Sequence, residues 1–188
     1  MNWLLEAQQA VIGSWRLLLR DTGGYDDFDL SERGFWRSFS AIVPIAPLYL
    51  YAATIEIPDE LTEEPSEQPE TSLGLIVFVL LVQWITWPLV MVFVARVAGF
   101  AHNYSRYIIA YNWSSILVLS AQMVPALMLA QGGSVAALGN LVFVLFLFAV
   151  LYYHWYIALT ALETTMSVAW TLVLADLVIG IGITRLFS

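Results

Sequence analysis

The segment TLVLADLVIGIG, residues 171–182, places one acidic side chain, Asp176, at the centre of an apolar run. An ionised Asp at the centre of a membrane-spanning helix costs about 2.5–3.5 kcal/mol on insertion scales. Asp176 could therefore be a proton or ion site. It could instead be a protonated or hydrogen-bonded group that fixes the register of its helix. Because it is a single acid of this kind in a small protein, we favour the structural role and keep the proton site as the alternative.

Two glutamines in other apolar segments are candidate polar partners inside the membrane. Gln83 lies about ten residues into the segment 73–97, which is about 15 Å along a helix that rises about 1.5 Å per residue. That depth matches the depth of Asp176, so the sequence predicts a hydrogen bond between Gln83 and Asp176. Gln122 lies closer to the outer end of its segment.

His154 belongs to the aromatic stretch YYHWY, near the end of another apolar segment. A histidine there could ligate a pigment or a haem, or relay protons. Tyr and Trp are, however, the residues enriched where a membrane meets water. We therefore interpret YYHWY as an aromatic belt at the cytoplasmic interface, with His154 as one of its interfacial residues.

Several function classes are disfavoured by composition. The chain has no cysteine, no lysine and only two histidines, which argues against thiolate chemistry, lysine Schiff bases and histidine-rich metal sites. Its net charge of −8 argues against nucleic acid as a partner. None of the common nucleotide-binding or hydrolase motifs is present. We expect no catalytic residues, no metal, no cofactor and no enzymatic activity.

The elements that must position these residues are membrane-spanning helices. The mean hydropathy is +0.77 and only 12% of the residues are charged, about half the share of an ordinary soluble domain. The expected fold is all-α and polytopic, with residues 1–37 forming an interfacial segment and 38–188 a five-helix transmembrane domain. Five segments are long enough to cross a bilayer, at 38–57, 73–97, 107–130, 138–159 and 166–186.

The orientation of these spans follows from the arginines, because short cytoplasmic loops carry an excess of positive charge. Six of the seven arginines fall on the N-terminal side of the membrane, and only Arg185 falls on the other. The loop 56–72 carries seven acids and no positive charge, and we interpret it as a solvated external tether. The sequence predicts a bacterial inner-membrane protein with a cytoplasmic N-terminus and a periplasmic C-terminus.

The first twenty residues predict an amphipathic helix. A polar stripe at helical spacing contains Glu6, Gln9, Gly13, Arg16 and Arg20, while apolar side chains that include Trp3 and Trp15 cover the rest. The apolar side of this helix could lie in the cytoplasmic interface of the membrane, or the same side could dock on the bundle, and the sequence leaves both open. Beyond it, Asp29 and Glu32 suggest a capped helix start, and Arg33 and Arg37 would anchor the first span at the headgroups.

The plan of a cytoplasmic N-terminal region, five spans and short loops resembles the YIP1 family, over about residues 30–186. Its best local support is YIIAYNWSSILVL, where Tyr111 matches a family tyrosine, although Ala110 replaces the preceding glycine and no proline follows until Pro125. The resemblance implies a non-enzymatic membrane organiser with no catalytic site to carry over.

Two functions are compatible with these features. The expected function is a scaffold or accessory subunit of a larger membrane complex, with membrane lipids and other membrane-protein subunits as partners. The alternative is a small proton-coupled transporter or channel that uses Asp176.

Overall fold

The computed structural model describes residues 3–55 and 72–187, and the regular elements in those ranges are all helices. Short 3₁₀ helices are labelled η. In chain order the elements are α1 (Trp3–Leu18), η1 (Thr22–Asp27), α2 (Glu32–Ser38), η2 (Phe39–Ala41), α3 (Ile42–Ala53), α4 (Leu73–Ala98), η3 (Ala101–Asn103), α5 (Tyr104–Leu129), α6 (Gly133–Ala161) and α7 (Met166–Phe187). The expected all-α class is confirmed for the described residues.

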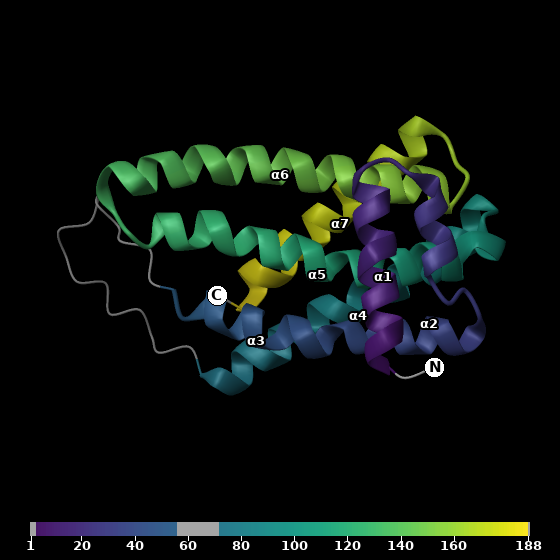
Figure 1. The fold of residues 1–188 in the computed structure, drawn as a ribbon, viewed down its shortest axis with the longest axis horizontal. Coiled ribbons are helices and arrows are strands. Elements are labelled where there is room, and N and C mark those ends of the chain that lie inside the picture. The colour runs from purple at the N-terminus through teal and green to yellow at the C-terminus, as the bar shows by residue number, and fades with distance from the viewer. Residues whose placement is uncertain (1–2, 56–71, 188) are drawn as a thin grey trace.

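Helix α5 lies at the centre of the bundle (Figure 1). It contacts α1, α2, α3, α4 and α6, and it forms an antiparallel hairpin with α6, while α7 packs against α6 and α4. The α5–α6 connection turns through Gly132 and Gly133, whose φ angles of 68° and 55° lie in the left-handed region that glycine adopts without strain. The most deeply buried side chains of α5 include Tyr107, Ile108 and Trp113.

Four helical segments are long and apolar enough to cross a membrane: Leu73–Ala98, Ala101–Leu129, Gly133–Ala161 and Met166–Phe187. They correspond to four of the five expected spans. Pro88 and Pro125 lie inside α4 and α5 without ending them. The hydroxyl of Tyr104 donates to the carbonyl oxygen of Pro88 at 3.0 Å, so a neighbouring helix supplies a hydrogen bond close to the proline.

The expected first span, 38–57, differs from a single long helix. It is divided among the end of α2, the 3₁₀ turn η2 and the 12-residue helix α3, which ends at Ala53. Twelve residues extend about 18 Å, less than the roughly 30 Å hydrocarbon core of a bilayer. Pro44 and Pro47 contribute no N–H to this stretch. The acidic loop lies outside the described residues, except for Ser72, which caps α4.

Helix α1 lies crosswise on α5 and α6 (Figure 1), but the docking alternative, in which its apolar side packs on the bundle, is wrong. The side of α1 that faces the bundle is the polar and small-residue side: its buried residues are Glu6, Ala10, Gly13, Ser14 and Leu17. The apolar side faces outward.

Four polar contacts fasten α1 to the bundle. Glu6 is buried and forms an ion pair with Arg37 of α2 at 2.6 Å. The indole N–H of Trp3 donates to the hydroxyl of Ser40 at 2.7 Å. From α6, the hydroxyl groups of Tyr153 and Tyr156 donate to the carbonyl oxygens of Ser14 and Arg20, at 2.7 and 2.8 Å. A buried charge is tolerated only when it is paired, so the Glu6–Arg37 pair fixes the rotation of α1.

The start of α2 corrects one detail of the sequence analysis. The N-cap is Ser31, whose hydroxyl accepts from the N–H of Gly34, and not Asp29. The carboxylate of Asp29 accepts instead from the N–H of Ser31 at 3.0 Å, so it closes the turn before the helix. These contacts with Ser31 hold the pKa of Asp29 below its ordinary value.

Helix α1 and η1 approach each other at a pair of glycines. A Cβ atom added to Gly13 would lie 2.6 Å from the carbonyl oxygen of Gly24, too close for the two backbones to stay in place. We therefore expect Gly13→Ala to lower the free energy of unfolding by about 1–3 kcal/mol, the usual penalty of overpacking.

The matched control is Gly182→Ala, because a Cβ there meets nothing within 4 Å. In a helix interior that change should raise stability by up to about 1 kcal/mol. Thermal unfolding of the purified protein in detergent measures both. Equal melting temperatures for the two variants would contradict the close packing of α1 on η1.

Candidate functional site

Asp176 lies half-buried near the middle of α7. Its carboxylate accepts a hydrogen bond from the hydroxyl of Tyr111 of α5, at 2.8 Å between the two oxygen atoms. A carboxyl group in hydrocarbon needs such a donor, because lipid offers none. Tyr111 is therefore the residue that accommodates Asp176 in this bundle.

The predicted hydrogen bond between Gln83 and Asp176 is wrong. The side-chain amide of Gln83 donates to the hydroxyl of Thr184, at 3.0 Å, two turns further along α7 than Asp176. The hydroxyl of Thr184 in turn donates to the carbonyl oxygen of Gly180. Depth alone suggested the pairing, but α4 directs Gln83 toward a later turn of α7.

A second aromatic contact adds His154 of α6 to this cluster. Its imidazole packs against the ring of Tyr111, with 5.0 Å between the ring centroids. The Nε2 atom of His154 is buried and has no hydrogen-bond partner among the described residues. We call Asp176, Tyr111 and His154 the central cluster.

The aromatic-belt interpretation of YYHWY is corrected by these positions. Tyr153, Trp155 and Tyr156 are buried, and only Tyr152 is exposed. Helix α1 and the 3₁₀ turn η1 pack on this end of α6 and cover it, because Tyr153 and Tyr156 bond to α1 and its C-terminal end, and Tyr25 bonds to Thr160. These side chains therefore contact protein, and His154 points into the bundle.

A cavity of about 760 Å³ opens beside Asp176, between α4, α5, α6 and α7. Its polar lining brings together Asp176, Tyr111, Gln83 and Gln122, which the sequence could only place in separate segments. Thr86, Thr184 and Arg185 also line it, and Trp87, Phe143 and Ile179 are among its apolar walls. The volume lies within the range of about 300–1,000 Å³ that is usual for small-molecule sites.

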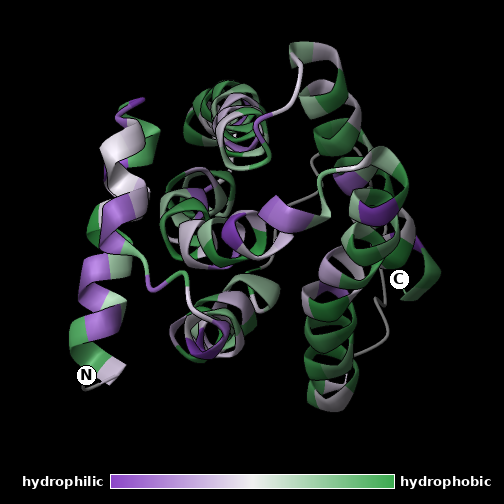
Figure 2. Ribbon diagram, turned by 90° about the vertical axis from the view of Figure 1, so that its right-hand side faces the viewer, coloured by the Kyte–Doolittle hydropathy of each residue, from purple (hydrophilic) through white to green (hydrophobic). Residues whose placement is uncertain are grey.

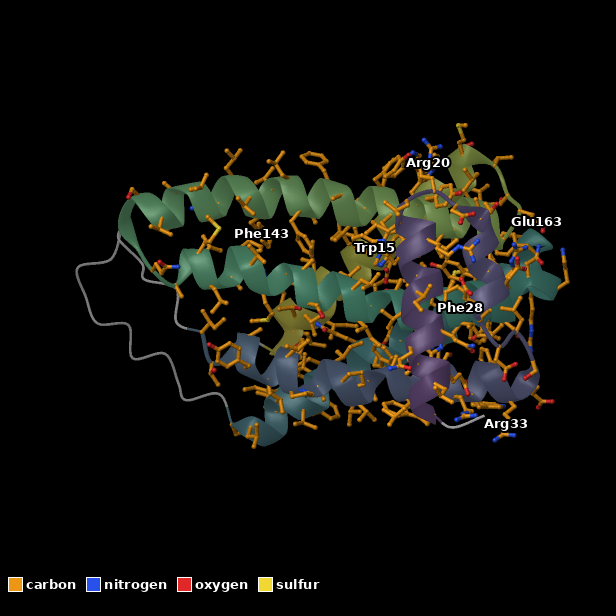
Figure 3. All side chains as sticks on the ribbon, viewed as in Figure 1. Trp15, Arg20, Phe28, Arg33, Phe143 and Glu163 are labelled. Atoms are coloured by element: carbon orange, nitrogen blue, oxygen red, sulfur yellow. The ribbon has the colours of Figure 1, made fainter. Side chains whose placement is uncertain are left out.

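Apart from Asp176 and Arg185, the charged side chains of the described residues gather toward the end of the bundle where α4 is followed by α5 and α6 by α7, which we call the arginine-rich end. Figure 3 shows Arg20, Arg33 and Glu163 in this region, whereas Phe143 lies toward the opposite end. The ion pairs of the described residues are Arg16–Asp21, Arg16–Asp27, Arg37–Glu6 and Arg106–Glu163. Asp176 belongs to none of them, and within the described residues its side-chain hydrogen bond is to a neutral hydroxyl.

The residues expected at the interface have different environments. Arg16 bonds to Asp21 and Asp27, and the bond from Arg16 holds the pKa of the Asp21 carboxyl below its ordinary value. The guanidinium of Arg20 lies over the rings of Tyr152 and Tyr156. Of the other residues expected at the interface, Trp15 and Arg33 are exposed. Trp3 forms a hydrogen bond and Arg37 forms an ion pair, as described above.

The chemistry open to this arrangement is binding and proton exchange. The cavity offers one carboxyl group, one phenol hydroxyl, two amides, two threonine hydroxyls and one guanidinium group. A carboxylate can hold a proton or a cationic group, and the amides and hydroxyl can orient a polar solute. No group of three or more His, Asp or Glu side chains that could hold a metal occurs in the part of the chain that the structure describes.

Sequence reasoning missed Tyr111 and Thr184 as the partners of the intramembrane polar residues. The signal for Tyr111 was available, because Tyr111, Asn112, Ser114 and Ser115 form a polar patch inside an apolar segment. Asn112 donates to the hydroxyl of Ser38 in α2, at 2.9 Å. A polar patch on one helix therefore marked the point where two other helices bond to it.

Comparisons with protein-family models, with curated proteins and with solved structures find no match for this chain. The resemblance to the YIP1 family therefore stays a prediction, and the site must be interpreted from its own geometry.

The corrected pairing can be tested by double-mutant cycles. We expect Tyr111→Phe and Asp176→Leu to be coupled by about 0.6 kcal/mol, the average for polar pairs inside membranes. Gln83→Leu and Asp176→Leu should be additive, because Gln83 bonds to Thr184. Unfolding in mixed micelles gives the free energies, with Tyr51→Phe, exposed on α3, as a control for losing a tyrosine hydroxyl. If Gln83→Leu is coupled to Asp176→Leu and Tyr111→Phe is not, the hydrogen bond between Gln83 and Asp176 that the sequence predicted would be correct after all.

Proposed function

We propose that this chain is a small proton-coupled transporter of the bacterial inner membrane, and that Asp176 is its proton site. The single observation that carries the proposal is the cavity of about 760 Å³ that opens beside an intramembrane carboxyl group. A carboxyl that served only as a packing contact would not need a cavity with other polar side chains next to it. Ionisable residues inside membranes mark ion or proton pathways by default.

The depth of the cavity is consistent with transport. Asp176 follows the first residue of α7 by ten positions, or about 15 Å, which is half of a hydrocarbon core of roughly 30 Å. Transporter sites lie near the middle of the bilayer, where polar groups of several helices converge. The polar lining contains Gln83, Tyr111, Gln122 and Asp176, which come from three different helices. The distances between these side chains therefore depend on how the three helices pack.

We further propose five spans, with α2, η2 and α3 acting together as the first. Residues 32–53 run from the arginine-rich end toward the opposite end, and α4 runs back in the other direction beside α3 (Figure 1). A turn of 3₁₀ helix and two prolines are compatible with a span, because α5 packs against this segment along its length. An odd number of spans places the two ends of the chain on opposite sides of the membrane.

The second candidate is the scaffold or accessory subunit, and one observation favours it. Few residues in the first half of α6 are buried. In its most apolar stretch 6% of the residues are buried, against 28% in the most apolar stretch of α4. The exposed side of this half of α6 offers a long surface to a helix of another subunit. The small and polar residues that would fix such a partner are confined to its first two turns, and residues 141–148 are all large and apolar, so the cavity carries the stronger argument.

The topology gives a direct prediction. A reporter that is active only in the periplasm should be active when inserted within 58–70 or fused after Ser188, because the arginine-rich end would stay in the cytoplasm. The same reporter at His102 should be inactive. Activity at His102 with none in 58–70 would reverse the orientation.

The transport hypothesis predicts the effect of removing only the charge. Asp176→Asn keeps the size of the side chain and an oxygen that can accept from Tyr111, so the fold should remain intact. Proton flux into liposomes under a pH gradient should be lost. Asp26→Asn is the matched control, because Asp26 is exposed in η1, and it should retain full flux.

Two other outcomes would contradict the proposal. No flux in the wild type, with only Asp176→Leu destabilised, would leave Asp176 a structural contact and favour the subunit hypothesis. Flux that persists in Asp176→Asn would place the proton site elsewhere.

A further inference from the structure

Helix α1 presents an apolar face away from the bundle. This outer face consists of Leu4, Leu5, Ile12, Trp15, Leu18 and Leu19, each between 39% and 64% exposed. Gln8 is the polar side chain among them. Figure 2 shows α1 at the flank of the molecule, running across helices that are seen end-on. Soluble proteins rarely leave such a continuous apolar face in water, so something covers it.

The outer face cannot turn inward, because the opposite side of α1 is bonded. The Glu6–Arg37 ion pair and the bonds from Tyr153 and Tyr156 all lie on the inner side or at the C-terminal end. Rotating α1 would leave the buried Glu6 without its partner. The outer face therefore belongs to the folded protein as it stands.

The depth of α1 follows from the length of α6. Its 29 residues extend about 43 Å, so about 6 Å would emerge on each side of a roughly 30 Å hydrocarbon core when α6 is centred. Tyr153 lies eight residues before Ala161, or about 12 Å from that end. Its bond to Ser14 therefore places α1 about 6 Å inside the hydrocarbon boundary.

We propose that α1 lies in the plane of the membrane, with its outer face among the acyl chains of the leaflet at the arginine-rich end. In-plane helices bury their apolar face about 5–10 Å into the boundary between headgroups and acyl chains, the depth that α6 imposes here. The crosswise direction of α1 relative to α5 and α6 is the direction this arrangement requires (Figure 1). The proposal does not depend on transport by Asp176.

The chain has no cysteine, so single-cysteine variants can be spin-labelled without background. The full-length protein would be reconstituted in vesicles of phosphatidylethanolamine and phosphatidylglycerol. Collisions with oxygen, which dissolves in lipid, are compared with collisions with a water-soluble nickel chelate. Labels at Ile12→Cys and Leu19→Cys report on the outer face. Three reference labels are needed. Glu163→Cys reports on water and Leu145→Cys on deep lipid, because both side chains are exposed, and Ala10→Cys reports on the protein interior, because Ala10 is buried.

We expect nickel collisions at positions 12 and 19 to be several-fold fewer than at position 163, with oxygen collisions well above those at position 10. Their depth should fall between positions 163 and 145. Nickel collisions equal to those at position 163 would overturn the proposal, because the face would then be in water. Shielding from both reagents, as at position 10, would also overturn it and would mean that protein covers the face. Thermal unfolding of each labelled variant, compared with the unlabelled protein, reports whether that preparation is folded.

Discussion

The arrangement of this bundle depends on the polar side chains of α5. Inside a bilayer, apolar surfaces do not select one another, because lipid tails are as apolar as the helices, so hydrogen bonds and close packing decide which helices meet. The first two turns of α5 bond to three other helices: Tyr107 accepts from Trp87 of α4, Tyr111 donates to Asp176 of α7, and Asn112 donates to Ser38 of α2. Without these bonds the remaining contacts would be largely interchangeable.

The same feature explains why much of the fold was predictable and the site was not. Span positions follow from length and hydropathy, which the sequence carries directly, and four of them have the expected bounds to within a few residues. Depth also follows from the sequence, because the rise per residue is fixed. The direction in which a side chain points around its helix follows only from packing. Gln83 and Asp176 were therefore matched in depth but wrongly paired.

Helix α1 illustrates a related limit. Its two-sided pattern was visible in the sequence and led to the expectation that the apolar side would meet the membrane or the bundle, but the opposite side docks. In a soluble protein the apolar side would face the core, whereas here the buried side carries Glu6, Gly13 and Ser14. The difference arises because small residues let backbones approach, as Gly13 does with Gly24, and because Glu6 has Arg37 as a partner. The polarity of the surroundings, which a single helix does not encode, decides the orientation.

Two adjacent residues in one turn of α6 connect α1 to the surroundings of Asp176. Tyr153 bonds to the backbone of α1, and the next residue, His154, packs on the phenol ring that bonds to Asp176. Adjacent residues of a helix move together, so a displacement of α1 is coupled to a displacement of the Tyr111 ring that lines the cavity. A lateral force on α1 would therefore be transmitted through this turn of α6 to the phenol ring of Tyr111, which lies beside the carboxyl group of Asp176.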